Sequence, residues 1–160
     1  MGSWKTTVGR ILADMMAWKF VDIDELIENE AKISISDIFE NYGEGKFRDL
    51  EAKVLESALQ ADGMIISTGG GTILSDKNRN LMKQYGYVIF LRAKPESLSN
   101  RIKNIAKRPI LAQAKDKLQV LKDIWEHRKD HYNSSADLIV DTDTLNPEGV
   151  ANEIYRKINR

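Results

Sequence analysis

The first residues of the chain include the side-chain types that a phosphate-binding site needs. Lys5 and Thr6 follow Gly2, Ser3 and Trp4 and begin an amphipathic segment. Backbone N–H groups at a helix start bind phosphate oxygens, a lysine neutralises their charge, and a hydroxyl can bind Mg²⁺. Lys5 and Thr6 match the end of the phosphate-loop pattern G-x-x-x-x-G-K-[ST], and Gly2 matches an internal glycine. Taken alone, this short fragment is better explained as a capped helix start with an exposed lysine.

Two carboxylates follow the first short apolar run. The segment Phe20-Val21-Asp22-Ile23-Asp24 is typical of a strand that ends in a D-x-D pair. Asp24 can accept a hydrogen bond from an attacking hydroxyl and orient it, or act as a general base. Asp22 and Asp24 also suit a helix N-cap and a solvated first turn. Since D-x-D also occurs as a metal motif in glycosyltransferases, the pair alone leaves these alternatives open.

Arginines and a glycine run form a second group of candidates. Arg48 lies three residues before Glu51, and Gly69-Gly70-Gly71 follows an apolar strand. Arg48 and Arg128 can clamp a carboxylate through planar guanidinium groups, and glycines let a backbone approach a substrate closely. The alternatives are a surface pair worth about 0.3 kcal/mol for Arg48 and Glu51, and a flexible turn for the glycines. Arg128 shares a helix face with Leu121, and its alternative is an arginine that reaches out to solvent.

Helical patterns alternate with short apolar runs along the chain, which favours an α/β fold with a parallel sheet. The apolar periodicity predicts helices over 5–17, 24–31, 47–58, 95–105 and 116–131, and a last helix from residue 147. Strands are predicted over 19–22, 64–67, 87–91 and 138–141, and the apolar run 87–91 suits a sheet covered on both faces. Because no internal repeat or linker is present, we expect a single domain over residues 1–160.

The composition excludes several classes of function. Lys and Arg number 24 and Asp and Glu number 24, so the net charge is 0 and a nucleic-acid partner is not expected. No apolar run approaches the ~20 residues that span a bilayer, and no signal-peptide pattern is visible. The absence of cysteine excludes disulfides, thiolate metal sites and cysteine nucleophiles. We expect a cytoplasmic protein with no membrane partner.

The motifs occur in an order that closely resembles the shikimate kinase family. They are residues 2–6, the D-x-D pair, Gly43-Glu44-Gly45-Lys46-Phe47-Arg48 with Glu51, Ser67-Thr68-Gly69-Gly70-Gly71-Thr72, Arg108-Pro109-Ile110-Leu111, Arg128 with Tyr132, and Asn146-Pro147. Lys5 to Asp24, Asp24 to Arg48 and Arg48 to Gly70 are 19, 24 and 22 residues, spacings similar to those of the family. The resemblance covers Met1 to Arg160, and the ordered set is specific although no single motif is decisive.

The resemblance implies a three-layer α/β/α fold of the P-loop NTPase, nucleoside-monophosphate-kinase type, with a central parallel sheet. It implies that the γ-phosphoryl group of ATP moves to the 3-hydroxyl of shikimate, on the way to chorismate and the aromatic amino acids, with Mg²⁺ as cofactor. A substrate-binding helical part is expected over about 23–62, and a lid that closes over ATP over about 107–117. A monomer is expected, with shikimate and ATP as its small-molecule partners.

The site residues of the family match positions of this sequence one by one. Asp24, Lys5 and Arg108 match catalytic residues, and Arg108 is the lid arginine that reaches the phosphates. The shikimate-binding positions are Asp24, Arg48, Gly69, Gly70, Gly71, Arg128, Phe47 and Glu51. The ATP-binding positions are Gly2, Ser3, Lys5, Thr6, Thr7, Arg101, Arg108 and Pro147. Thr6 matches a Mg²⁺ ligand, and Asp22 matches a carboxylate that holds metal-bound water.

Two features depart from the family pattern. Trp4 occupies the position of the glycine directly before the lysine, and the first glycine of the pattern and the strand before it would precede Met1. A side chain at position 4 is expected to introduce ~1–3 kcal/mol of backbone strain and a steric conflict with nucleotide. Because that strand is central in the sheet of this fold, we expect a gap between its neighbours. The expectation is either a start placed too late or a protein that has lost normal ATP binding.

Two other functions stay open at this point. The first is a non-catalytic or impaired relative that binds shikimate or a partner, which Trp4 and the missing strand favour. The second is a related P-loop kinase for another small hydroxy acid, such as gluconate. The set of Asp24, Arg48 and Arg108 argues against the first, and Phe47 with the glycine run favours shikimate over other acids.

Overall fold

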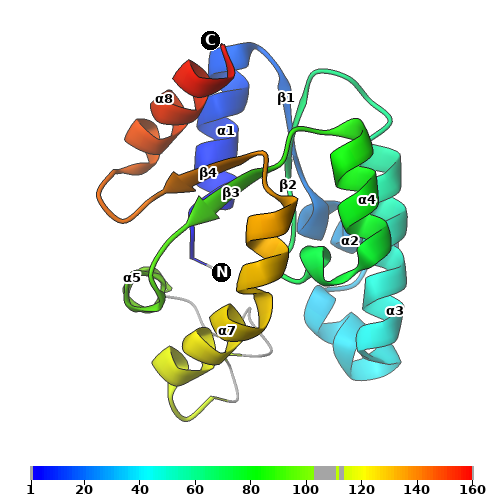
Figure 1. Cartoon of the computed structure of the whole chain (residues 1–160). Helices are drawn as coiled ribbons and strands as arrows, with labels where there is room; N and C mark the ends of the chain where they lie inside the picture. The colour runs from blue at the N-terminus through cyan, green and yellow to red at the C-terminus, as the bar shows by residue number, and fades with distance from the viewer. Residues whose placement is uncertain (1, 103–110, 112–113, 160) are drawn as a thin grey trace.

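The computed structural model describes residues 2–102, 111 and 114–159, and helices alternate with short parallel strands along them (Figure 1). The elements in chain order are α1 (Lys5–Met16), β1 (Lys19–Asp22), α2 (Ile23–Ala31), α3 (Ile35–Ala58), β2 (Met64–Ser67), the 3₁₀ helix η1 (Thr72–Leu74), α4 (Asp76–Tyr85), β3 (Ile89–Arg92), α5 (Pro95–Arg101), α7 (Lys117–Ser135), β4 (Leu138–Asp141) and α8 (Pro147–Ile158). The mixed α/β architecture with parallel strands agrees with the fold class predicted from the sequence.

Polar side chains define several helix starts. Ser34 and Asp37 form a capping box at α3, in which each side chain accepts a hydrogen bond from the backbone of the other. The Asn146 side chain accepts from the backbone N–H of Gly149, and Pro147 occupies the first turn of α8, where no partner for its nitrogen is needed. These caps satisfy backbone donors that a helix start otherwise leaves unpaired.

The four strands form two separate parallel pairs. β1 pairs with β2 in the register Lys19 to Met64, and β3 pairs with β4 in the register Ile89 to Leu138. Within the described residues no strand joins β2 to β3, so the sheet is divided at this point. The gap that we expected from the sequence is therefore present between these two strands.

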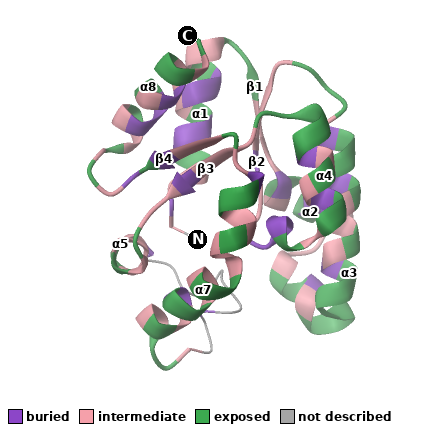
Figure 2. Ribbon diagram, in the orientation of Figure 1, coloured by how far each residue is buried: buried purple, intermediate pink, exposed green. Residues whose placement is uncertain are grey.

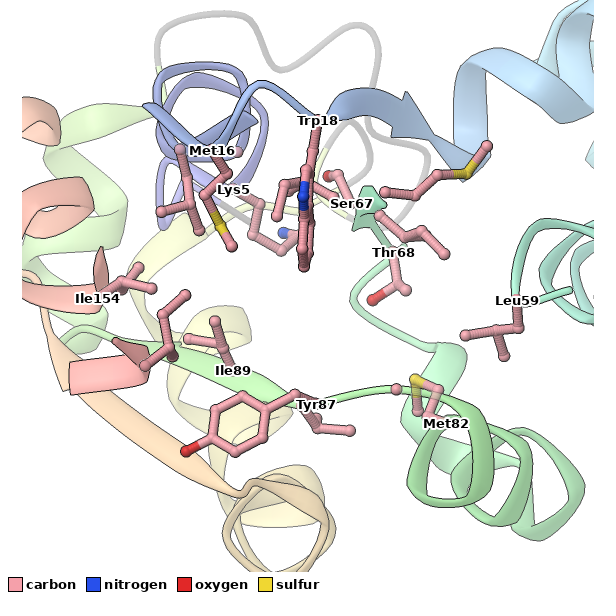
Figure 3. Close-up of a pocket in the computed structure, with 18 of the residues that line it drawn as sticks. Lys5, Met16, Trp18, Leu59, Ser67, Thr68, Met82, Tyr87, Ile89 and Ile154 are labelled. Carbon is pink, nitrogen blue, oxygen red and sulfur yellow. The ribbon is translucent and has the colours of Figure 1, made fainter. Parts of the chain in front are cut away.

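A cavity of about 770 Å³ occupies the space between the two strand pairs (Figure 3). β2 and β3 line it from either side, and residues of α1, α3, α4 and α8 complete the wall. Ile65, Ile66 and Ile89 border the cavity and are only partly buried. Strands inside a parallel sheet are normally buried on both faces, so this exposure results from the unfilled space beside them.

Two hydrophobic clusters lie on either side of this cavity. One joins α1 to α8 and to the β3–β4 pair through Val8, Leu12, Val140, Val150 and Ile154 (Figure 2). The other joins α2, α3 and α4, with buried residues Ile23, Ile27, Ile38, Phe47, Val54, Leu55, Ala58, Ile73 and Met82. The two clusters position the two ends of the site described below.

The sequence-based prediction missed two helical segments and misplaced the ends of three elements, since α5 ends at Arg101, α7 ends at Ser135 and β3 spans Ile89–Arg92. α3 begins at Ile35 rather than near residue 47, because it consists of two helical parts that meet at a kink at Gly43, where φ is 79°. The prediction also omitted α4, a mostly polar helix that starts at a Ser75 cap. Among the described residues, no helix combines the length and the apolar character that a bilayer span requires.

Candidate active site

The start of α1 lines a polar cavity of about 330 Å³. The residues that line it are Gly2, Ser3, Trp4, Lys5, Thr6, Thr7, Asp22, Asp24, Ser67, Thr68, Gly69, Gly70 and Arg101. The carboxyl ends of β1 and β2 and the amino end of α1 therefore meet at one place, as expected for a ligand site in a parallel α/β sheet. Lys5 also lines the larger cavity between β2 and β3 (Figure 3), so it lies where the two spaces adjoin.

Trp4 has the backbone conformation that the sequence pattern reserves for glycine. Its φ is 64° and its ψ is 21°, in the left-handed region that side chains with a Cβ rarely adopt. The expected strain at this position is thus present in the structure. The indole ring lies against the guanidinium of Arg101, with 3.6 Å between the Arg101 Cζ and the ring centroid.

Asp22 interacts with both neighbouring elements at the end of β1. Its Oδ1 accepts from the Asp24 backbone N–H over 3.1 Å, which makes Asp22 the N-cap of α2. Its Oδ2 accepts from the Thr6 hydroxyl over 3.0 Å. The capping role that the sequence left open is thus real, and it coexists with a contact to the phosphate loop.

Asp24 is partly buried in the first turn of α2, and its environment disfavours the charged form. Burial, together with the charges of Asp22 and Glu51, raises the pKa of Asp24 from 3.8 to about 6, although Lys5 acts in the opposite direction. A carboxylate with a pKa near 6 is a stronger base than an ordinary aspartate and is still largely ionised at neutral pH. Asp24 can therefore accept a proton or a hydrogen bond from a substrate hydroxyl.

The glycine run after β2 packs closely against Glu51 and Arg48. A Cβ at Gly69 would lie 2.8 Å from Glu51 Oε1, and one at Gly71 would lie 2.5 Å from an Arg48 nitrogen. Only glycine allows this approach of backbone and charged side chains. The glycines are therefore required for packing against the protein's own side chains, and the predicted approach to a substrate stays a prediction.

Glu51 connects Arg48 to the glycine loop. It is 1% exposed, its Oε1 accepts from the Thr72 hydroxyl over 2.6 Å, and its Oε2 accepts from Arg48 over 2.8 Å. The surface-pair alternative for Arg48 and Glu51 is wrong, because Glu51 is fully buried. Arg48 also lies over the ring of Phe47 and receives support from Glu44, so its guanidinium is oriented from several sides.

Arg128 reaches the glycine loop from α7. Its guanidinium donates to the Gly70 carbonyl over 3.0 Å, and the Tyr132 hydroxyl donates to the same oxygen over 2.6 Å. The Tyr132 ring stacks on Phe90 of β3 with 4.7 Å between the ring centroids. Arg128 is thus directed at the loop and does not extend into solvent. Arg48 lies against Gly71 and Arg128 donates to Gly70, so the two guanidinium groups approach adjacent residues of the loop.

One predicted ATP position is not brought to the polar cavity, and another is not described by the structure. Pro147 begins α8 and does not line the cavity, although Arg101 does. Arg108 and most of the predicted lid over 107–117 lie outside the described residues. The predicted helical part over 23–62 corresponds to α2 and α3, which carry Asp24, Phe47, Arg48 and Glu51.

Thr6 and Asp22 are the oxygen donors that suit a magnesium ion. Mg²⁺ commonly takes one or two protein oxygens and completes its octahedron with water and substrate phosphates. In residues 2–102, 111 and 114–159, no group of three or more His, Cys, Asp or Glu side chains could hold a metal by itself. This donor set fits an ion bound mainly through phosphate oxygens and water.

Sequence reasoning missed the supporting roles of Thr72 and Thr142. Thr72 is fully buried and donates to Glu51, and Thr142 is fully buried and accepts from Arg101 over 2.8 Å. The sequence offered one signal for these roles, a threonine directly after a glycine run (Thr72) or a strand (Thr142). It is weak, because such residues also occur in ordinary turns.

Comparison with known proteins gives one consistent family. The family model described as shikimate kinase matches residues 1–159. The shikimate kinase of Sulfurihydrogenibium sp. is 42% identical over 160 residues, which are 100% of this chain and 94% of that protein. The shikimate kinase of Thermodesulfovibrio yellowstonii is 36% identical over 100% of this chain and 91% of its own length.

Solved structures agree with these relatives. A shikimate kinase from Acinetobacter baumannii in complex with shikimate superposes with a TM-score of 0.95 at 34% identity, over 99% of this chain and 88% of that one. The shikimate kinase from Aquifex aeolicus superposes with a TM-score of 0.85 at 34% identity, over 99% of this chain and 92% of that one. By sequence and by structure, the chain belongs to the shikimate kinase family.

Proposed function

We propose that this chain transfers the γ-phosphoryl group of ATP to the 3-hydroxyl of shikimate. The observation that supports this most directly is the position of Asp24. It lies between the lysine at the start of α1 and the glycine loop that Arg48 and Arg128 approach. One carboxylate thus adjoins both a phosphate-binding element and a site for an organic anion, which is the arrangement that phosphoryl transfer to a hydroxy acid needs.

The start of α1 would bind the nucleotide phosphates. Backbone N–H groups of the first turn and the Lys5 ammonium can bind phosphate oxygens. Thr6 and Asp22 would hold Mg²⁺, which supplies charge neutralisation on the phosphates when it is bound. Arg101, Pro147 and the lid arginine Arg108 complete the proposed ATP site.

The glycine loop and its two arginines would bind shikimate. Arg48 and Arg128 would bind the carboxylate, and Gly69, Gly70 and Gly71 would keep space for the ring. Glu51 is a positioning residue, because it contacts Arg48 and the loop hydroxyl of Thr72. Asp24 would accept the hydrogen bond of the 3-hydroxyl and orient its oxygen toward the γ-phosphorus. With a pKa of about 6, roughly nine-tenths of Asp24 is ionised at pH 7.

The direct test is shikimate-dependent release of ADP by the purified chain with ATP and Mg²⁺. Turnover is expected with shikimate and not with gluconate or without an acceptor, and it is expected to stop when EDTA removes Mg²⁺. Phosphorylation of gluconate in preference to shikimate would contradict the proposed substrate. The same preparation tests the expected monomer by light scattering, and fractionation of the source cells tests the expected cytoplasmic location.

An impaired relative is the second candidate, because two observations concern nucleotide binding directly. Trp4 has a strained φ of 64°, and a cavity of 770 Å³ lies beside the strand from which the glycine loop extends. This candidate predicts shikimate binding without turnover. Calorimetric titration with shikimate and with ADP separates the two, since only the impaired relative would bind shikimate and not ADP.

A further inference from the structure

Trp4 makes a close contact with Arg101 that the motif analysis did not predict. The Arg101 Cζ lies 3.6 Å from the centroid of the indole ring, well within the distance at which a guanidinium interacts with an aromatic face. The Arg101 side chain is only 14% exposed, so little water screens this contact. The indole also packs against the cluster that joins α1, α8 and the β3–β4 pair.

Arg101 is itself attached to the end of β4. One guanidinium nitrogen donates to the Thr142 hydroxyl over 2.8 Å, and another donates to the Thr142 carbonyl over 2.6 Å. Thr142 is fully buried and bonds in turn to the Arg92 carbonyl at the end of β3. Trp4, Arg101 and Thr142 therefore form a continuous connection from the phosphate loop to the β3–β4 pair.

The residues before α1 also lie against α5. Trp4 contacts Arg101 at the last turn of α5, and Gly2 lies beside the same helix. Gly2 lies so close to α5 that an added Cβ would be 3.2 Å from the Leu98 carbonyl oxygen and 3.0 Å from Ile102.

The contact also opposes the energetic cost of a large residue at position 4. A left-handed conformation costs a residue with a Cβ ~1–3 kcal/mol. A partly buried cation–π contact is worth about 0.5–2 kcal/mol, and packing of the indole on the apolar cluster adds to it. The two effects are of similar size, so the indole can act as an attachment point without preventing the loop from forming.

We propose that Trp4 is a positioning residue, which orients Arg101 and attaches the phosphate loop to the end of β4. Through this attachment the indole supports nucleotide binding, the opposite of the steric obstruction that the motif comparison predicts. The inference rests on the proposed function, because it assumes that the cavity lined by Lys5, Thr6 and Arg101 binds ATP. It concerns nucleotide affinity alone and predicts no effect on shikimate.

The test compares Trp4→Gly, Trp4→Phe, Arg101→Gln and the double variant Trp4→Gly/Arg101→Gln. We expect Trp4→Gly and Arg101→Gln each to raise the KM for ATP and the Kd for ADP by about 3- to 30-fold, with the KM for shikimate unchanged. Trp4→Phe keeps an aromatic face and should stay within about 3-fold of the parent protein. The double variant should bind ADP no more weakly than the single variant with the larger Kd, because both changes remove the same contact.

Trp18→Phe is the matched control, since it alters an exposed tryptophan that lies outside the polar cavity. It should leave the KM for ATP unchanged. Tighter or equal ADP binding by Trp4→Gly would overturn the proposal and show that the indole obstructs the site. Additive losses in the double variant would overturn it as well. If the parent protein binds ADP but shows no turnover with shikimate, the proposed function fails, while the ADP titrations still decide the role of Trp4.

Discussion

Around Gly69–Gly71, a buried carboxylate, two arginines and a tyrosine form two sets of hydrogen bonds at one loop, whereas the start of α1 borders an unfilled cavity of 770 Å³. In the first region, no residue departs from the family pattern that the motifs gave for the shikimate site. The second has Trp4 in place of a glycine and a divided sheet behind it. Both regions contribute to one proposed reaction, but the glycine loop is closely packed, whereas the start of α1 borders an unfilled space.

This difference indicates in which region a substitution should cost more stability. A hydrogen-bonded loop around buried Glu51 loses much of its geometry when one partner changes, because each buried polar group depends on its neighbours. At the start of α1, Trp4 stacks on Arg101 and Thr6 donates to Asp22, and both contacts lie outside the network around Glu51. Changes there should therefore affect nucleotide affinity more than stability. The following predictions test this division, from the largest expected effect to the smallest.

Asp24 lies between the two regions, and Asp24→Asn should have the largest effect. Loss of the base should lower kcat about 10²- to 10⁴-fold. In the parent protein, kcat/KM should fall as the pH drops through about 6, where Asp24 takes up a proton. Activity assays over pH 5–8 measure both effects. A parent profile that stays flat across pH 6 would contradict the assignment of Asp24 as the group that orients the hydroxyl.

The same substitution should stabilise the fold at neutral pH. The pKa of Asp24 is 3.8 when exposed and about 6 in the fold, so the native state binds the proton more tightly. Stability from this group is therefore lost as the pH rises from about 4 to 6, by up to about 3 kcal/mol. Asp24→Asn removes that loss at pH 7–8, and its advantage should shrink toward pH 4. Urea unfolding at both pH values measures it, and an equal shift at both would contradict the burial argument.

Truncating a side chain should cost more stability in the cluster between α2, α3 and α4 than in the wall of the large cavity. Ile27 is 1% exposed among α2, α3 and α4, so Ile27→Ala should lower the free energy of unfolding by about 2–5 kcal/mol. Ile89 borders the cavity and is partly buried, so Ile89→Ala should cost only about 1 kcal/mol. Urea titration of both variants checks the comparison. Equal losses would indicate that the space between β2 and β3 is closed in solution.

The contrast between the two regions also explains what could be predicted from the sequence. Strands 19–22, 64–67 and 138–141 were predicted with the bounds that the structure has, because short apolar runs between polar turns are a local signal. The first part of α3 was missed because Gly43 interrupts its periodicity, and α4 was missed because it offers few apolar residues.

In the candidate site, only residues that belong to a sequence motif could be predicted. The residue types of the glycine loop were predicted, but the Tyr132 bond to Gly70 joins positions 62 residues apart and has no local pattern. Trp4 was recognised as a departure, and its conformation followed from the motif. The contact of Trp4 with Arg101 could not be predicted from the motif, because stacking between residues distant in the sequence depends on how α5 packs against α1.

Gly71→Ala should affect the shikimate side of the site more than the nucleotide side. The new Cβ would lie 2.5 Å from a terminal nitrogen of Arg48, so the guanidinium must shift against the contacts that hold it to Glu51 and Glu44. We expect about a tenfold higher KM for shikimate, with the KM for ATP unchanged and a loss of stability of about 1–3 kcal/mol. Gly45→Ala is the matched control, since its Cβ would meet nothing within 4 Å. A rise in both KM values would show that the two regions are coupled more tightly than their contacts indicate.

Tyr132→Phe should produce the smallest effect and the most specific one. It removes the 2.6 Å hydrogen bond to the Gly70 carbonyl and keeps the ring stacked on Phe90. Arg128 still donates to that oxygen, so the carbonyl is not left unpaired and the loss should be about 0.5–1.5 kcal/mol. The KM for shikimate should rise about 2- to 5-fold, while Tyr42→Phe, at a tyrosine that is 64% exposed, should change nothing. Unchanged shikimate binding in Tyr132→Phe would mean that Arg128 alone holds the loop.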